Sequence, residues 1–131
     1  MKKPLINYLI PFVLAFLFSG CQDKTQDPAE ITVDQFISIQ DKENFILLDV
    51  RTSQEYKRGH LQDAILLDVY TEDAGNRINQ LDKNKVYYVY CHTGVRSRSV
   101  VNFMRSKGFK QVYDIRGGII QLSRKGVKLV P

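Results

Sequence analysis

The sequence of 131 residues has a length typical of one domain. Apolar residues make up 44% and charged residues 25% of it, which excludes a disordered or low-complexity chain. Two cysteines are too few for a disulfide-stapled miniprotein or a four-cysteine zinc site. The net charge of +5 is modest and scattered along the chain, so we expect no nucleic-acid partner.

The N-terminus has the pattern of a secretory signal peptide over residues 1–20. Lys2 and Lys3 are followed by Leu5–Phe18, in which twelve of fourteen residues are apolar or aromatic. This run is shorter than the ~20 residues that a membrane-spanning helix needs. An ordinary signal peptide cleaved near this point would leave Cys21 as a plain thiol.

The residues that end this signal resemble a bacterial lipobox. Ser19 and Gly20 are the small residues before Cys21, although Phe18 stands where the motif usually has leucine. The resemblance implies that the signal is cleaved before Cys21 and that this cysteine is lipidated. Its acyl chains would anchor the protein at the bacterial cell envelope, as its only membrane contact. Gln22 favours the outer membrane.

Beyond Cys21 the sequence changes from a polar tether to alternating strands and helices. Residues 21–30 are polar with no apolar periodicity, which predicts a tether, and we expect the domain over residues 31–131. Thr32 followed by Gln35 is typical of a capped helix start. The other expected elements are strands over 45–50, 64–67, 86–90 and 112–115, and helices over 53–58, 73–81, 97–107 and 119–125. This order predicts an α/β domain with a mainly parallel sheet.

The residues with chemical potential centre on Cys91, which directly follows the most strand-like run, residues 86–90. In open α/β sheets, ligands bind at the carboxyl ends of strands. The N–H groups and partial positive charge at a helix start favour a thiolate and can hold an anion. Gly94 lets the backbone fold tightly around such an anion, and Arg96 adds a permanent cation.

An inert buried thiol is a simpler interpretation of Cys91, because cysteine is often buried. That interpretation explains neither the turn at Gly94 nor the arginines at positions 96 and 98. We therefore interpret Cys91 as a nucleophile in an anion-binding loop.

Several motifs, in the right order, resemble the rhodanese homology domain over residues 31–131. They are Leu48–Arg51 with Glu55 and Tyr56, Gly59–Leu61 with Ala64, Tyr90–Ser97, and the two pairs Gly117-Gly118 and Gly126-Val127. The chain departs from the family at Asp63, where glycine is common, and at Ile65, where asparagine is common. It also has no tryptophan, which the family favours in the last helix, and Leu122 is the nearest candidate.

The resemblance implies a five-stranded, mainly parallel sheet flanked by helices, and a sulfurtransferase that needs no cofactor or metal. Cys91 would carry sulfur as a persulfide, taken from a small anionic donor such as thiosulfate. The acceptor would be cyanide, or a thiol of a small molecule or a protein. The resemblance assigns the anion-binding loop to His92, Thr93, Gly94, Val95 and Arg96, and supporting roles to Asp49, Arg51, Glu55 and His60.

Two alternatives to a sulfurtransferase remain. Phosphatases related to this fold use a longer loop with arginine six places after the cysteine, whereas that place here is Ser97. The second alternative is a catalytically silent binding or redox module. Such modules commonly lack the loop cysteine, which this chain has.

Overall fold

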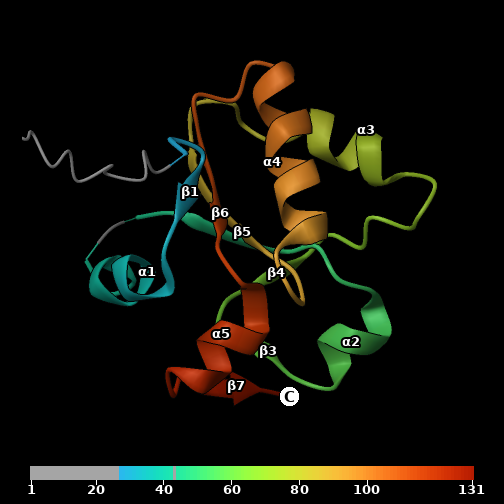
Figure 1. Cartoon of the computed structure of the whole chain (residues 1–131). Helices are drawn as coiled ribbons and strands as arrows, with labels where there is room; N and C mark the ends of the chain where they lie inside the picture. Colours follow the sequence, from blue (N-terminus) through green and yellow to red (C-terminus); the bar gives the residue numbers. More distant parts are fainter. Residues whose placement is uncertain (1–26, 43) are drawn as a thin grey trace, which may run out of the picture.

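The computed structural model describes residues 27–42 and 44–131, which form a five-stranded parallel sheet with helices on both faces (Figure 1). The sheet has the order β1-β6-β5-β2-β4. Its strands are β1 (Glu30–Ile31), β2 (Ile46–Asp49), β4 (Ile65–Leu66), β5 (Val86–Tyr90) and β6 (Gln111–Ile115). The predicted α/β fold class and the five-stranded parallel sheet are therefore confirmed.

Helices cover the two faces of the sheet in different pairs (Figure 1). On one face, α3 (Ala74–Asn79) and α4 (Val95–Ser106) supply Ile78, Val101 and Met104 to the core. On the other face lie α1 (Val33–Ile39) and α5 (Gly118–Arg124), which supply residues such as Phe36 and Leu122. Because both faces are covered, the central strands read as continuous apolar runs.

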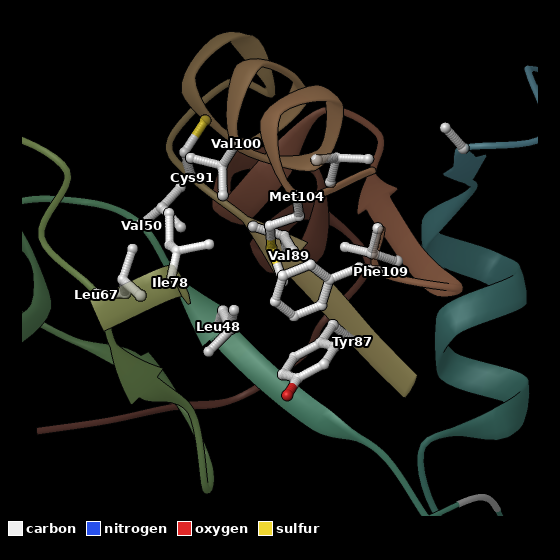
Figure 2. Packing of buried hydrophobic residues seen from close by; sticks show 13 residues of the cluster. Leu48, Val50, Leu67, Ile78, Tyr87, Val89, Cys91, Val100, Met104 and Phe109 are labelled. Carbon is white, nitrogen blue, oxygen red and sulfur yellow. The ribbon is translucent and has the colours of Figure 1, made fainter. Parts of the chain in front are cut away.

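Strand β5 shows how one sequence run serves both cores. Tyr87 and Val89 belong to the cluster under α3 and α4, whereas Tyr88 and Tyr90 belong to the cluster under α1 and α5. This alternation follows from the two-residue period of a strand. Figure 2 shows the first cluster, in which Cys91 lies beside Val50 and Val100 at one end.

Capping residues define the starts of three helices, and the sequence signal located the start of α1 correctly. Thr32 and Gln35 form the predicted capping box at the start of α1, with the Thr32 N–H donating to Gln35 Oε1 at 2.7 Å. Helix α2 (Ser53–Lys57) begins with a second capping box, made by Thr52 and Glu55. Helix α4 begins at Val95 rather than Ser97, because Gly94 adopts a left-handed φ of +102° and serves as its N-cap.

Two features of the fold were not expected from the sequence. Strands β3 (His60–Leu61) and β7 (Leu129–Val130) form a separate antiparallel pair, too short for a periodic signal. Strand β1 pairs with β6 and contains Glu30, and Ala29 beside it is only 2% exposed. Ala29 and Glu30 therefore belong to the fold, although we expected them in the tether.

The departures from the family pattern fit the fold. Asp63 adopts a left-handed φ of +62°, the backbone region in which glycine is favourable. Ile65 is more than half exposed at 53%, so its apolar side chain replaces a polar residue at the surface. Leu122 is fully buried and fills part of the core under α5.

The expected signal peptide, the lipidated Cys21 and most of the tether lie outside the described residues. Within residues 27–42 and 44–131, no helix is long and apolar enough to cross a membrane.

Candidate functional site: a buried cysteine in a backbone loop

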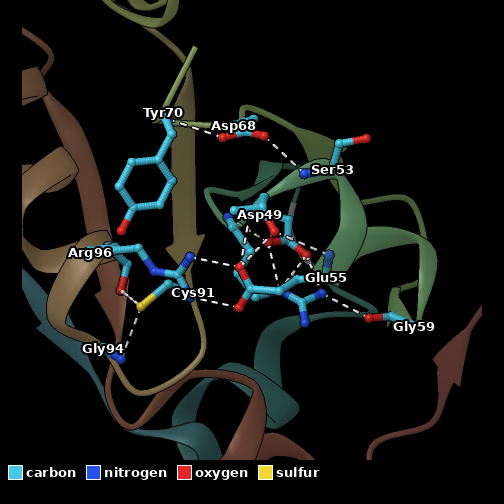
Figure 3. A network of polar contacts seen from close by, with 12 residues as sticks. Asp49, Ser53, Glu55, Gly59, Asp68, Tyr70, Cys91, Gly94 and Arg96 are labelled. Atoms are coloured by element: carbon cyan, nitrogen blue, oxygen red, sulfur yellow. Dashed lines mark hydrogen bonds and ion pairs between the residues drawn. The ribbon is translucent and has the colours of Figure 1, made fainter.

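The candidate site lies where β2 and β5 end side by side. Asp49 and Tyr90 are partners in the parallel register of these strands. The chain leaves β5 through Cys91 and turns at Gly94 into helix α4. The sheet therefore places the Cys91 loop next to the polar residues that follow β2, as shown in Figure 3.

The sulfur of Cys91 is recessed and surrounded by hydrogen-bond donors. The residue is 1% exposed. Its Sγ accepts a hydrogen bond from the Gly94 N–H at 3.1 Å and one from the Ser97 hydroxyl at 3.4 Å. Burial raises the pKa of the thiol, but hydrogen bonds from Ser97, Gly94 and Thr93 outweigh burial and leave the pKa below its usual value. This environment favours the thiolate, the reactive form of cysteine.

The start of α5 holds the outer side of the loop. The Ile119 N–H donates to the Cys91 carbonyl at 2.8 Å, and the Ile120 N–H donates to the His92 carbonyl at 3.3 Å. Gly118 makes this approach possible, because a Cβ there would lie 2.4 Å from the Cys91 oxygen. With these carbonyls bonded to α5, the loop presents N–H groups to the sulfur.

Arg96 and Glu55 form a two-armed ion pair at the edge of the loop. Both Arg96–Glu55 hydrogen bonds are 2.8 Å long. The hydrogen bond from Arg96 holds the pKa of Glu55 well below its usual range, and the same contact raises the pKa of Arg96. The Arg96 guanidinium also lies 6.0 Å from the centre of the Tyr70 ring, whose residue is 71% exposed. Arg96 is therefore fixed beside the loop before any ligand arrives.

Asp49 and Arg51 form a buried network beside the loop. Asp49 is fully buried and Arg51 is 4% exposed. Arg51 donates to the Asp49 carboxylate through Nε and Nη2 at 2.6–3.0 Å. Its Nη2 also donates to the Gly59 carbonyl at 2.8 Å. The Tyr90 hydroxyl accepts a hydrogen bond from the Leu61 N–H at 3.1 Å, and the Arg51 guanidinium lies 5.7 Å from the centre of the Tyr90 ring. The network ties β2, β5 and the start of β3 together and so supports the loop indirectly.

Neither histidine is among the residues that hydrogen-bond the Cys91 sulfur in the described part of the chain. His60 stacks on Tyr56 at 3.6 Å, and its Nδ1 lies 3.1 Å from the Tyr56 carbonyl, so its contacts fix a turn. His92 is exposed and lines a cavity of about 530 Å³ beside α5. Arg58 and Arg124 line the same cavity, together with apolar residues such as Ile120.

The structure thus brings most of the predicted site residues together. The Gly94 N–H donates to Cys91 Sγ, and Thr93 helps to lower the pKa of this thiol. Arg96 pairs with Glu55 at the rim, and Val95 is 73% exposed. Sequence reasoning did not assign Ser97, which donates to the sulfur, nor Tyr70 beside Arg96. Ser97 lies one helical turn after Gly94, and this spacing could have identified it as a neighbour of the loop. No sequence pattern indicates that Tyr70 lies beside Arg96.

Comparison with known proteins agrees with the fold. The family model of the rhodanese-like domain matches residues 32–125, and the chain belongs to this family. A rhodanese-related protein from Thermoplasma volcanium superposes with a TM-score of 0.69 at 25% identity, covering 77% of this chain and 96% of that one. A rhodanese-like domain protein from Staphylococcus aureus superposes with a TM-score of 0.65 at 26% identity, and the match covers 78% of this chain and 98% of that one.

Among curated proteins, the tRNA uridine(34) hydroxylases of two bacteria are similar to this chain. The Yersinia pestis (strain Pestoides F) protein is 34% identical over 114 residues, and the Sodalis glossinidius protein is 32% identical over 114. Each alignment covers 81% of this chain but 32% of the relative. The chain therefore spans about a third of the length of these relatives.

Proposed function

We propose that the protein is a sulfurtransferase that carries sulfur as a persulfide on Cys91. The observation that carries this proposal is the recessed Cys91 sulfur, 3.1 Å from the Gly94 N–H and 3.4 Å from the Ser97 hydroxyl. A pKa below the usual value makes the thiolate available to attack. A loop of N–H groups can stabilise the anionic sulfur that forms, as an oxyanion hole stabilises oxygen.

The reaction has two half-reactions. The Cys91 thiolate attacks the outer sulfur of thiosulfate, the sulfur–sulfur bond of the donor breaks, and sulfite leaves with the bonding electron pair. An acceptor thiolate or cyanide then attacks the outer sulfur of the persulfide, and the Cys91 thiolate is the leaving group. Covalent catalysis of this kind predicts ping-pong kinetics.

The first test is the mass of the protein after exposure to thiosulfate. A Cys21→Ala variant leaves Cys91 as the one remaining thiol, since the sequence has two cysteines. We expect a gain of one sulfur atom, which cyanide removes as thiocyanate. No gain with thiosulfate or with an organic persulfide donor would contradict the proposal and favour a silent module. Phosphate release from a phosphate ester would favour the phosphatase alternative.

The cavity next to the loop leads to a prediction about acceptors. Arg58 and Arg124 are exposed there and form no ion pair with other described residues. Their charges suit an acceptor thiol that carries carboxylates. In the double variant Arg58→Ala/Arg124→Ala, we expect the KM for mercaptosuccinate to rise roughly 3–10-fold, with that for 2-mercaptoethanol unchanged. The measurement is the acceptor-dependent rate at saturating thiosulfate.

Arg105→Ala is the matched control, because Arg105 is an exposed arginine on α4 that does not line this cavity. An equal KM increase for the charged and the neutral acceptor would refute the assignment of these arginines to acceptor binding.

We further propose that Cys21 is lipidated and that the protein works at the bacterial cell envelope. The support is the sequence pattern alone: a basic start, an apolar run, and small residues before Cys21. Cells that express the full chain should incorporate labelled palmitate into it, and Cys21→Ala should abolish the label. Label that persists in Cys21→Ala, or none in the unmodified chain, would rule out this anchor.

A further inference from the structure

Tyr70 is an exposed aromatic residue at the edge of the Cys91 loop. It is 71% exposed, and its ring centre lies 6.0 Å from the guanidinium carbon of Arg96. Figure 3 shows the ring extending from its own loop toward Arg96, which lies in the first turn of α4. Val95, directly before Arg96, is 73% exposed. In the part of the chain that the structure describes, the two most exposed large apolar side chains therefore lie at this loop.

The backbone that carries Tyr70 is held in place by Asp68. The Tyr70 N–H donates to Asp68 Oδ1 at 3.0 Å, and the Ser53 N–H at the start of α2 donates to Asp68 Oδ2 at 2.9 Å. The Thr71 hydroxyl donates to the Asp68 carbonyl at 2.9 Å. A ligand that packs against the Tyr70 ring therefore needs little further ordering of the protein backbone.

The positive charge of Arg96 is already paired with the carboxylate of Glu55. Both hydrogen bonds between the two side chains are 2.8 Å long. Glu55 is held in turn by the N–H and the hydroxyl of Thr52, at 3.0 and 2.9 Å. Thiosulfate carries two negative charges, and it gains less from a guanidinium that a carboxylate has neutralised. Beside Tyr70, the loop therefore offers a ligand an aromatic surface rather than an unpaired charge.

We propose that Tyr70 is a specificity-determining residue, which selects sulfur donors that carry a flat apolar group beside the sulfur to be transferred. An organic thiosulfonate is the simplest donor of this class, because an organic group replaces one oxygen of thiosulfate and removes one negative charge. The organic group packs on the exposed ring of Tyr70 while the outer sulfur enters the loop. This inference rests on the proposed function and defines its donor class.

The reaction with a thiosulfonate has the same form as the reaction with thiosulfate. The Cys91 thiolate attacks the outer sulfur, the sulfur–sulfur bond of the donor breaks, and an organic sulfinate leaves with the bonding electron pair. The outer sulfur keeps its negative charge in the Cys91 persulfide. The step therefore needs no proton, oxidant or reductant.

The test compares benzenethiosulfonate, methanethiosulfonate and thiosulfate as donors to cyanide, with the full chain carrying Cys21→Ala in detergent. Because the three donors differ in intrinsic reactivity, the measured quantity is the change in each kcat/KM between variants. Tyr70→Ala should lower kcat/KM for benzenethiosulfonate about 3–10-fold through a higher KM, with kcat nearly unchanged. The values for the other two donors should stay nearly unchanged. Tyr70→Phe keeps the ring and should retain the preference of the unmodified residue.

Phe103→Ala is the matched control for Tyr70→Ala. Phe103 is an exposed aromatic residue on α4, about two helical turns beyond the Cys91 loop, and Lys107 Nζ lies 5.2 Å from its ring centre. Its loss should leave the donor preference unchanged. An equal fall in kcat/KM for all three donors in Tyr70→Ala, or the same change in Phe103→Ala, would overturn the proposal.

Glu55→Gln tests the charge argument separately. Glutamine also completes a capping box, so the start of α2 should persist, but the charge of Arg96 is no longer neutralised. The KM for thiosulfate should fall about 2–5-fold, and the KM for benzenethiosulfonate should fall less. A KM for thiosulfate that stays the same or rises would contradict the role given to the pair of Arg96 and Glu55.

A binding measurement separates this inference from the proposed function. Benzenesulfonate has the ring but no outer sulfur to transfer, and it should protect Cys91 from alkylation by iodoacetamide at a lower concentration than methanesulfonate does. Tyr70→Ala should remove this difference. The expected protection without sulfur transfer from any donor would refute the proposed function but not aromatic binding at Tyr70. Sulfur transfer with the same donor preference in the unmodified chain and in Tyr70→Ala would refute the role of Tyr70 alone.

Discussion

Replacing Cys91 with serine is expected to reduce transfer of sulfur from thiosulfate to cyanide by at least about a thousandfold, to background. A serine hydroxyl is not ionised at neutral pH and cannot form the persulfide. Serine also fits the same hydrogen bonds from Gly94 and Ser97, so the fold should persist. The assay is thiocyanate formation, with thermal unfolding as the control for folding.

The pH dependence of the proposed reaction in the unmodified protein should report the ionisation of the same thiol. The pKa of Cys91 lies below its usual value of about 9.0, since hydrogen bonds outweigh burial. The rate of sulfite release in the first turnover should therefore stay constant as the pH falls through 9.0. It should decline only when the pH falls through the lowered pKa of Cys91. A residual rate in Cys91→Ser, or a decline centred on the pKa of an ordinary thiol, would contradict the proposed role.

Gly118→Ala is expected to damage both activity and stability. Gly118 has a φ of +57°, and an added Cβ would lie 2.4 Å from the Cys91 oxygen and 2.7 Å from the His92 oxygen. Both obstacles are backbone atoms, so the loop and the start of α5 must move apart. We expect a loss of roughly 2–4 kcal/mol in the free energy of unfolding, from left-handed strain plus steric overlap. Displacement of the loop by an ångström should cost about a hundredfold in kcat.

Gly126→Ala is the matched control for this prediction. Gly126 has a φ of +82°, yet no atom lies within 4 Å of its added Cβ. It should therefore show the backbone strain alone, with sulfur transfer unchanged. Denaturant unfolding and single-turnover sulfite release measure the two effects. Equal losses of activity in the two variants would show that contact with the Cys91 loop is not what makes Gly118 important.

The sequence predicted those parts of the structure that depend on local patterns. The run Val86–Tyr90 is β-branched and aromatic throughout, which identified it as a strand, and its position immediately before Cys91 identified the loop. The capping box of Thr32 and Gln35 located α1. Strands β3 and β7 were not predicted, because each has two residues and their paired residues lie 68 and 70 positions apart in the sequence.

In the site, too, contacts between residues close in the sequence could be predicted, whereas contacts between distant residues could not. The N–H groups of Thr93 and Gly94 follow from a glycine turn before a helix, so the loop could be predicted. The hydrogen bonds from the Ile119 and Ile120 N–H groups to the carbonyls of Cys91 and His92 depend on how α5 packs against the loop, and no local pattern encodes them. The same holds for the pairing of Arg96 with Glu55, which lie 41 residues apart.

The depth of the Cys91 sulfur makes the site selective by size. At 1% exposure, the empty thiolate is out of reach of bulky disulfides, so a protein disulfide cannot readily capture it. A persulfide bond adds a second sulfur about 2 Å beyond the first. In the proposed reaction, we therefore expect the outer sulfur to lie closer to the surface than Cys91 Sγ. The fold would then shelter the Cys91 thiolate between turnovers and expose mainly the sulfur atom that is transferred.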